Sequence, residues 1–218
     1  MLIGKATKYG AGITLYGDYW DLHNLYETIH FLANGVPFNE QFSNFVLGLA
    51  YDIRHAYQGN RKKRIFGYDN IDKISYRGVD ILWPFFLVQV GMLRWSAGFH
   101  ATTREHQANL FRLEACSQQA LISYDAEIGA QCFSWLTEFP GLPDNYLLEF
   151  ISESTKKYIF ESKPGKSRFR QLPEVLLNLS PISPEYTAFE AEIKKAAKDQ
   201  GCKPEDIEIA YDWPDFKW

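Results

Sequence analysis

Three side chains of the types that bind metal ions or transfer protons, His23, Glu27 and His30, lie close together in the sequence. Residues three and four positions apart are neighbours on a helix surface, so these offsets place all three on one flank of a predicted helix. Glu-x-x-His is also a ligand pattern of carboxylate-bridged di-iron helix bundles. These residues are therefore the candidate metal ligands, and they define the alternative function, a metal-assisted enzyme.

A second acidic residue–histidine pair, Asp52 and His55, lies on the next predicted helix, and Glu105, Glu114 and Glu127 are the acids available to complete a site. Di-iron bundles take single glutamates from two helices and paired motifs from the other two. Here the paired motifs fall on consecutive helices, and one pair uses aspartate. The pattern therefore favours hydrogen-bonded polar side chains over metal ligands.

The sequence predicts no cofactor. Gly10-Ala11-Gly12 lacks the third glycine of a dinucleotide fingerprint and the Gly-Lys-Ser/Thr of a P-loop, so it indicates a turn. The Gly-x-Ser-x-Gly elbow of serine hydrolases is missing as well.

The three cysteines, Cys116, Cys132 and Cys202, have no paired spacing, which is typical of reduced thiols in a cytoplasmic protein. Cys116 and Cys132 fall within apolar helical patterns, where thiols are usually buried and inert. We therefore expect a cytoplasmic protein without disulfides.

The composition is that of a globular protein, with 46% hydrophobic and 23% charged residues in 218 residues. The aromatic content is high, at 16 Phe, 13 Tyr and 6 Trp, and each such ring buries a large area when it packs. We expect one domain over residues 1–218, an aromatic-rich core and a homo-oligomer with aromatic contacts between subunits.

The net charge of −4 argues against nucleic-acid binding by electrostatics alone. Two basic groups stand out nevertheless. The first is a run in a predicted turn, Arg61, Lys62, Lys63 and Arg64, and the second extends from a predicted helix into the loop at 163–170: Lys156, Lys157, Lys163, Lys166, Arg168 and Arg170. Two solvated loops are the simplest interpretation. An acidic partner protein is the next interpretation, and a phosphate backbone comes last.

The most apolar block, residues 81–93, is too short for a membrane span of about 20 residues and contains Pro84, Gln89 and Gly91. A helix that is apolar on nearly all sides belongs in the middle of a core. The first residues show no secretory signal. We therefore expect no membrane association and a helix from Pro84 that passes through the centre of the domain.

Alternating and helical patterns predict the other elements. Asp18 is the predicted N-cap of the first long helix, which ends at Asn34-Gly35, and a capping box is predicted at Thr102 and Glu105. The remaining predictions are strands over residues 2–7, 12–16, 64–68, 73–77 and 207–211, a turn at Asp69-Asn70, helices over 39–57, 145–160, 172–179 and 183–201, and a long helix from 102 broken near 123–125. Residues 140–143 should stop a helix, and Asp144 should cap the next one. The aromatic C-terminal residues 210–218 should pack on their own domain, with another copy of the chain as the alternative.

Three stretches, residues 16–30, 76–84 and 106–114, resemble an uncharacterised bacterial family, a domain of unknown function. The resemblance runs from the first strand to about Trp135. It implies a bacterial, cytosolic, stand-alone domain, and it brings no catalytic residue with it.

Together these patterns predict an α+β fold: a mostly helical single domain with a small, mainly antiparallel sheet. The leading hypothesis for the function is a non-enzymatic cytoplasmic binding or interaction protein with a protein partner. It rests on the weakness of the catalytic motifs, the charge runs and the excess of aromatic residues.

Overall fold

The fold is a mostly helical α+β arrangement around a small antiparallel sheet, as predicted. The computed structural model describes residues 1–35, 39–66, 73–139, 146–207, 213 and 215–218. The sheet has the order β1-β2-β4-β3, and all its neighbouring strands are antiparallel. The strands are β1 Ile3–Ala6, β2 Gly12–Gly17, β3 Lys62–Phe66 and β4 Ile74–Leu82.

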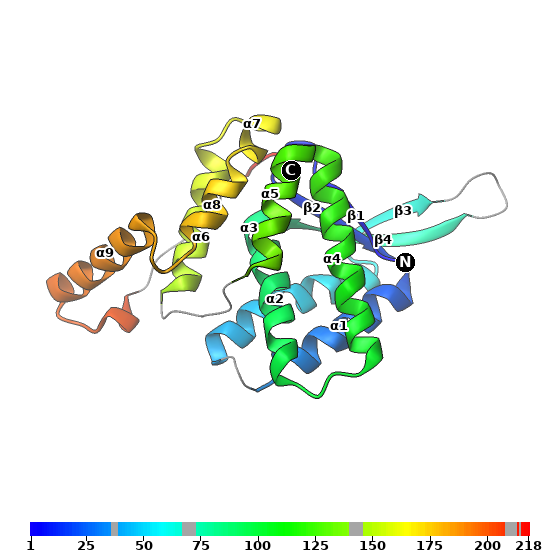
Figure 1. Cartoon of the computed structure of the whole chain (residues 1–218), viewed down its shortest axis with the longest axis horizontal. Helices are drawn as coiled ribbons and strands as arrows, with labels where there is room; N and C mark the ends of the chain where they lie inside the picture. The colour runs from blue at the N-terminus through cyan, green and yellow to red at the C-terminus, as the bar shows by residue number, and fades with distance from the viewer. Residues whose placement is uncertain (36–38, 67–72, 140–145, 208–212, 214) are drawn as a thin grey trace.

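Helices make up most of the described chain (Figure 1). Two short 3-10 turns, Ala97–Phe99 and Pro204–Asp206, accompany them. The helices are α1 Tyr19–Ala33, α2 Glu40–Tyr57, α3 Trp83–Ser96, α4 Arg104–Tyr124, α5 Ala126–Thr137, α6 Leu147–Phe160, α7 Lys166–Phe169, α8 Leu172–Asn178 and α9 Pro184–Gln200.

The two faces of the sheet differ in chemistry, because successive side chains of a strand point to opposite faces. One face carries Ile13, Leu15 and Val79, which are buried against the helices. This inner face also carries Gly4, where an added Cβ atom would collide with the carbonyl group of Cys116, so α4 packs closely on β1. The opposite, outer face combines polar side chains with an aromatic cluster of Tyr16, Phe66 and Tyr76.

The outer face contains a short chain of polar contacts. The Thr14 hydroxyl donates to one carboxylate oxygen of Asp80 at 2.6 Å, and Lys62 pairs with the other at 2.5 Å. The register of β2, β4 and β3 therefore brings opposite charges together on the outer face, and it also brings apolar side chains together on the inner face.

Helix α3 passes through the core, as its apolar sequence predicts. Trp83, Phe86 and Leu87 have no exposed surface. The one amide in the middle of the helix, Gln89, is buried, and its Nε2 donates to the backbone oxygen of Phe45 at 2.8 Å. Among the described residues no helix combines the length and the apolar content that a membrane span requires.

The predicted helix starts are confirmed in one case and shifted in another. Asp18 caps α1 and accepts from the backbone N–H of Asp21 at 2.8 Å. The capping box predicted at Thr102 is wrong by one residue. Thr103 caps α4, accepting from the backbone N–H of His106 at 3.2 Å, whereas the Thr102 hydroxyl accepts from Gln107 at 2.8 Å.

The predicted break in the long helix is confirmed at Asp125. This residue ends α4, and its side chain accepts from the backbone N–H of Ile128 at 3.4 Å to start α5. The two helices are therefore joined by a single capping residue. The predicted turn at Asp69-Asn70, the helix stop at 140–143, the cap at Asp144 and most of the strand predicted over 207–211 lie outside the described residues.

The last residues pack on their own chain, as expected. The ring of Trp213 contacts those of Phe85 and Phe160, with centroids 6.1 and 6.2 Å apart. Phe216 also packs on Phe160, at 6.1 Å. The backbone N–H of Tyr9 donates to the oxygen of Trp218 at 3.0 Å, which joins this segment to the β1–β2 turn.

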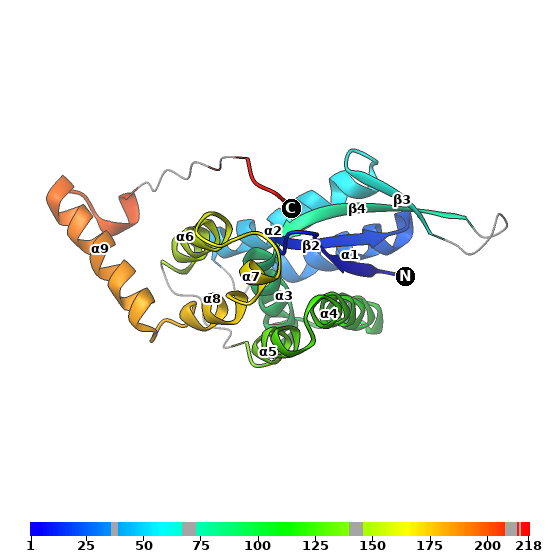
Figure 2. The same ribbon diagram turned by 90° about the horizontal axis from the view of Figure 1, so that it is seen from above.

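The molecule is elongated. Strands β3 and β4 project from the body at one end, and α9 lies at the other, with α6 and α8 between α9 and the core (Figures 1 and 2).

Candidate functional site

The histidines of the predicted metal flank lie within aromatic packing. The ring of His23 lies nearly parallel to those of Tyr19 and Tyr26, with centroids 5.6 and 6.5 Å away, and the ring of Tyr57 meets it edge-on at 5.6 Å. His30 packs on the other side of Tyr26, at 4.3 Å. Aromatic stacking thus accounts for the positions of both imidazoles.

The structure adds no support for metal binding at this flank. No group of three His, Cys, Asp or Glu side chains suited to a metal ion occurs in the described part of the chain. The Nδ1 atom of His23 is buried and has no hydrogen-bond partner in that part of the chain. The assignment of His23, Glu27 and His30 as metal ligands stays a prediction that rests on their spacing.

The second acidic residue–histidine pair also has local partners. Asp52 accepts from Arg61 at 3.4 Å, and the Nδ1 atom of His55 lies 3.4 Å from the amide of Asn60. Burial raises the pKa of Asp52, and the nearby Arg61 opposes that shift. These side chains tie the end of α2 to the start of β3.

The first basic run lies partly on an edge strand, so its predicted turn conformation is wrong. Lys62, Lys63 and Arg64 belong to β3. Lys62 is paired with Asp80, and the Arg64 guanidinium lies over the ring of Phe66, 5.0 Å from its centroid. Lys63 is exposed and has no ion pair within the described residues.

The second basic group is not a solvated loop throughout, because α7 forms within it and Arg168 is 2% exposed. The Arg168 Nη1 donates to the backbone oxygens of Tyr9 at 3.3 Å and Lys217 at 3.2 Å. Its Nη2 donates to that of Ile159 at 2.8 Å. Burial lowers the pKa of the Arg168 guanidinium. Arg168 therefore joins three segments of its own chain and is not available to bind a partner protein.

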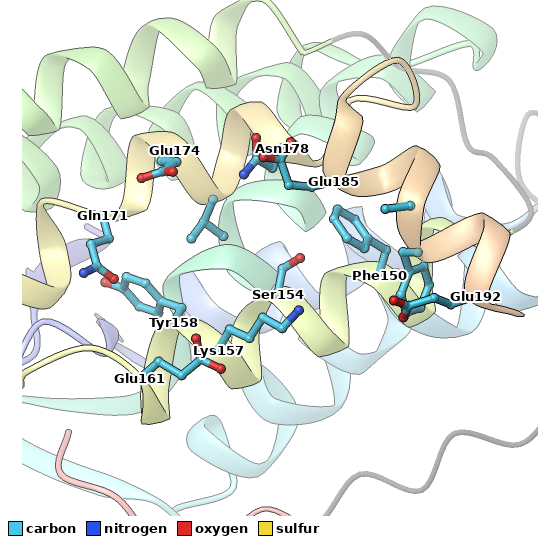
Figure 3. A pocket seen from close by; sticks show the side chains of 13 residues that line it. Phe150, Ser154, Lys157, Tyr158, Glu161, Gln171, Glu174, Asn178, Glu185 and Glu192 are labelled. Atoms are coloured by element: carbon cyan, nitrogen blue, oxygen red, sulfur yellow. The ribbon is translucent and has the colours of Figure 1, made fainter.

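A cavity of about 460 Å³ lies between α6, α8 and α9 (Figure 3). We call it the groove. Its apolar surface includes Phe150 of α6, Val175 of α8 and Phe189 of α9. The two phenylalanine rings lie 5.2 Å apart, and Tyr186 packs on Phe150 at 5.3 Å, which fixes α9 beside α6. A volume of this size lies within the range of small-ligand sites.

Four exposed glutamates surround this apolar surface: Glu161, Glu174, Glu185 and Glu192. None of the four has an ion pair in the described part of the chain. The cation at the groove, Lys157, pairs instead with Glu153 at 3.7 Å. The rim is therefore acidic, and its four glutamates have no ion-pair partner among the residues that the structure describes.

A buried hydroxyl group also points into the groove. Ser154 is 9% exposed, and its side chain is directed toward the cavity (Figure 3). The nearby hydroxyls of Ser152 and Thr155 donate to backbone oxygens four residues earlier, at 2.9 and 2.6 Å. The Ser154 hydroxyl has no such partner among the described residues, so it is available to a bound molecule.

Sequence reasoning did not find the groove. Its lining residues come from three helices spread over residues 150–192, so no local spacing links them. The one local signal is the pair Glu185 and Glu192, which lie seven residues apart on one side of α9 and both reach the rim. The groove exists only because α9 packs back against α6 and α8.

The family model for a domain of unknown function, DUF6904, matches residues 2–218. The chain belongs to the DUF6904 family. Neither the curated proteins nor the solved structures contain a match. The match confirms the resemblance to a family of unknown function and extends it over nearly the whole chain. Membership of the DUF6904 family therefore assigns no function to the groove.

Proposed function

We propose that this chain is a non-enzymatic binding protein whose groove takes up a cationic, partly apolar segment of a protein partner. The observation that carries the proposal is the set of four unpaired glutamates around an apolar surface between α6, α8 and α9. A cation at the rim gains Coulomb energy with several carboxylates at once, and an apolar side chain inside the groove is removed from water.

The chemistry of the groove selects among partners. A purely apolar segment leaves the rim charges unused, and a nucleic acid is repelled by them. A segment that alternates cationic and apolar side chains satisfies both parts of the groove, and its backbone offers an acceptor to the Ser154 hydroxyl. This argument supports a protein partner rather than nucleic acid.

We further propose a cytoplasmic location in a bacterium. Cys116, Cys132 and Cys202 are free thiols, which is the usual state of cysteines in a reducing compartment. The resemblance to a bacterial family supports the bacterial origin. The cytoplasmic location and the bacterial origin are thus both proposals.

The proposal is tested with a short fluorescent peptide that alternates lysine and leucine, titrated with the full-length protein and followed by anisotropy. We expect saturable binding that weakens as salt is added, because salt screens interactions between exposed charges. A peptide of the same length that alternates glutamate and leucine should not bind.

The groove variant carries Glu174→Gln and Glu185→Gln, and its matched control carries Glu105→Gln and Glu127→Gln. Both control residues are exposed, lie outside the groove and have no ion pair in the described part of the chain. Both variants lose two negative charges, so a general effect of net charge changes them equally. We expect the groove variant to lose about tenfold in affinity, about 1.4 kcal/mol, and the control to keep it. Equal affinities for the two variants, or no binding by the unmodified protein, would overturn the proposal.

A further inference from the structure

We propose that the segment that occupies the groove is the projecting strand pair of a second copy of this chain. The inference rests on the proposed function, because it names the partner of the same groove. We call this pair the arm: residues 62–66 of β3 with residues 74–78 of β4. Arg77 and Gly78 still pair with β2, and the rest of the arm extends beyond the other strands.

The arm presents two cations side by side. Lys63 and Arg77 are directly opposite each other in the register of β3 and β4, and so they lie on the same face. Like charges in directly opposed positions destabilise a strand pair. Neither cation has an ion pair in the described part of the chain. An external acidic group would relieve this repulsion.

The same face carries an exposed apolar side chain. Ile65 follows Lys63 by two residues, so it lies about 7 Å further along the strand on the same side. It is 61% exposed. In the body of the sheet this face is the inner one and packs on helices, but at the arm Lys63 and Ile65 are exposed and Arg77 is half-buried. The arm is thus an uncovered continuation of the core-facing surface.

The arm and the groove are complementary in charge and in apolar surface. Lys63 and Arg77 match the acidic rim, represented by Glu174 and Glu185, and Ile65 matches the apolar surface of the groove. Neither set of charges has an ion pair within the described part of its own chain.

One molecule cannot satisfy its own groove, because the arm and α9 lie at opposite ends (Figures 1 and 2). Each copy therefore offers one arm and one groove, and the contact is head-to-tail. Contacts of this type form rings or open chains rather than two-fold dimers. We expect the molecular mass in solution to rise with concentration.

The two faces of the arm provide an internal control. Arg64 is adjacent to Lys63 in sequence but points to the outer face, where it lies over Phe66. Lys62 is on that outer face too and is paired with Asp80. A charge reversal at position 64 changes the net charge as much as one at position 63, but it leaves the proposed contact face intact.

The experiment uses two full-length variants and measures mass by light scattering and sedimentation. The arm variant carries Lys63→Glu and Arg77→Glu and keeps an intact groove. The groove variant carries Glu174→Gln and Glu185→Gln and keeps an intact arm. Neutral side chains are used because a groove made basic would attract the reversed, acidic arm. Each alone should stay monomeric at concentrations where the unmodified chain associates. An equimolar mixture should form a one-to-one heterodimer that grows no further, because only one complementary pair of surfaces remains.

Single substitutions complete the test. Lys63→Glu should weaken association about tenfold, whereas Arg64→Glu should change it less than about threefold. Thermal melting checks that each variant is folded, and Lys63→Gln with Arg77→Gln replaces the arm variant if the reversed pair does not fold. Equal effects at positions 63 and 64, or a mixture of variants that stays monomeric, would overturn the inference.

The outcomes separate this inference from the proposed function. If the unmodified chain binds the lysine–leucine peptide but stays monomeric at every concentration, the groove binds a different protein and only the second-copy inference fails. If the peptide does not bind either, both fail.

Discussion

Arg168 is a buried charge without a carboxylate partner in the described part of the chain, and its guanidinium is held by backbone oxygens instead. These oxygens belong to the β1–β2 turn, the end of α6 and the C-terminal segment. The residue therefore connects the sheet to the helices that form the groove. Sequence reasoning placed Arg168 in a basic surface loop, because a run of cations gives no sign of which member turns inward.

Replacing Arg168 with Met should destabilise the protein by about 2–4 kcal/mol, because the backbone oxygens that accept its hydrogen bonds lose their donors. The neighbouring Arg170 is exposed, and its nearest carboxylate atom, on Asp125, is 3.9 Å away. Arg170→Met should cost less than about 0.5 kcal/mol. Urea unfolding measures both values, and equal losses would show that Arg168 does not connect these segments.

The cysteines differ in burial, which predicts their reactivity. Burial raises the pKa values of Cys116 and Cys132 to about 12. A raised pKa keeps a thiol protonated, so at about pH 8 only about one in ten thousand of either thiol is the reactive thiolate. Cys202 is half-buried. Labelling of the folded protein with a thiol reagent should modify Cys202 alone, and unfolding should expose all three. Rapid labelling of Cys116 in the folded protein would contradict this burial.

The prediction of metal ligands at His23, Glu27 and His30 is tested by elemental analysis of protein purified without added metal. The aromatic packing of both histidines leads us to expect no stoichiometric metal. Stoichiometric zinc or iron, lost in a His30→Ala variant but kept in a His106→Ala variant, would instead support the metal-assisted alternative.

At the scale of elements, local patterns predicted most of the fold. Asp18 and Ser183 each cap a helix that the sequence predicts to start there, because a cap depends on a few adjacent residues. At the predicted break, Asp125 caps the second helix, which the break alone did not predict. The shifted capping box at Thr103 shows the limit of such patterns. Thr102 and Thr103 offer the same hydroxyl, and the choice depends on His106, which packs on Phe31 at 4.2 Å.

Removal of residues 213–218 should destabilise the protein by about 2–4 kcal/mol, because the aromatic rings that cover Phe85 and Phe160 are lost. The melting temperature measures the effect. As a control, Lys217→Ala removes a side chain that lies over the ring of Tyr9 but keeps the backbone contacts, so it should change the melting temperature little. An unchanged melting temperature and mass after truncation would refute the packing of this segment.

At the scale of the whole molecule, two surfaces with unbalanced charge lie at opposite ends, the acidic groove and the basic arm. Sequence reasoning found Lys63, because it lies in a run of four consecutive cations, but not Arg77, which comes beside it only through the strand register. It missed the groove, because the glutamates of the rim meet only after α6, α8 and α9 have packed. The net charge of −4 indicates neither surface, because it adds the positive charges of the arm to the negative charges of the groove.

The most direct test of the account locates a bound peptide on the protein. A lysine–leucine peptide with a photoreactive group in place of one leucine is irradiated with the full-length protein, and the attachment site is mapped by mass spectrometry. We predict attachment at groove residues such as Phe150, Val175 or Phe189, competed by unlabelled peptide and reduced by Glu174→Gln with Glu185→Gln. Attachment outside α6, α8 and α9, or attachment that competitor peptide does not reduce, would contradict the claim that the groove is the binding site.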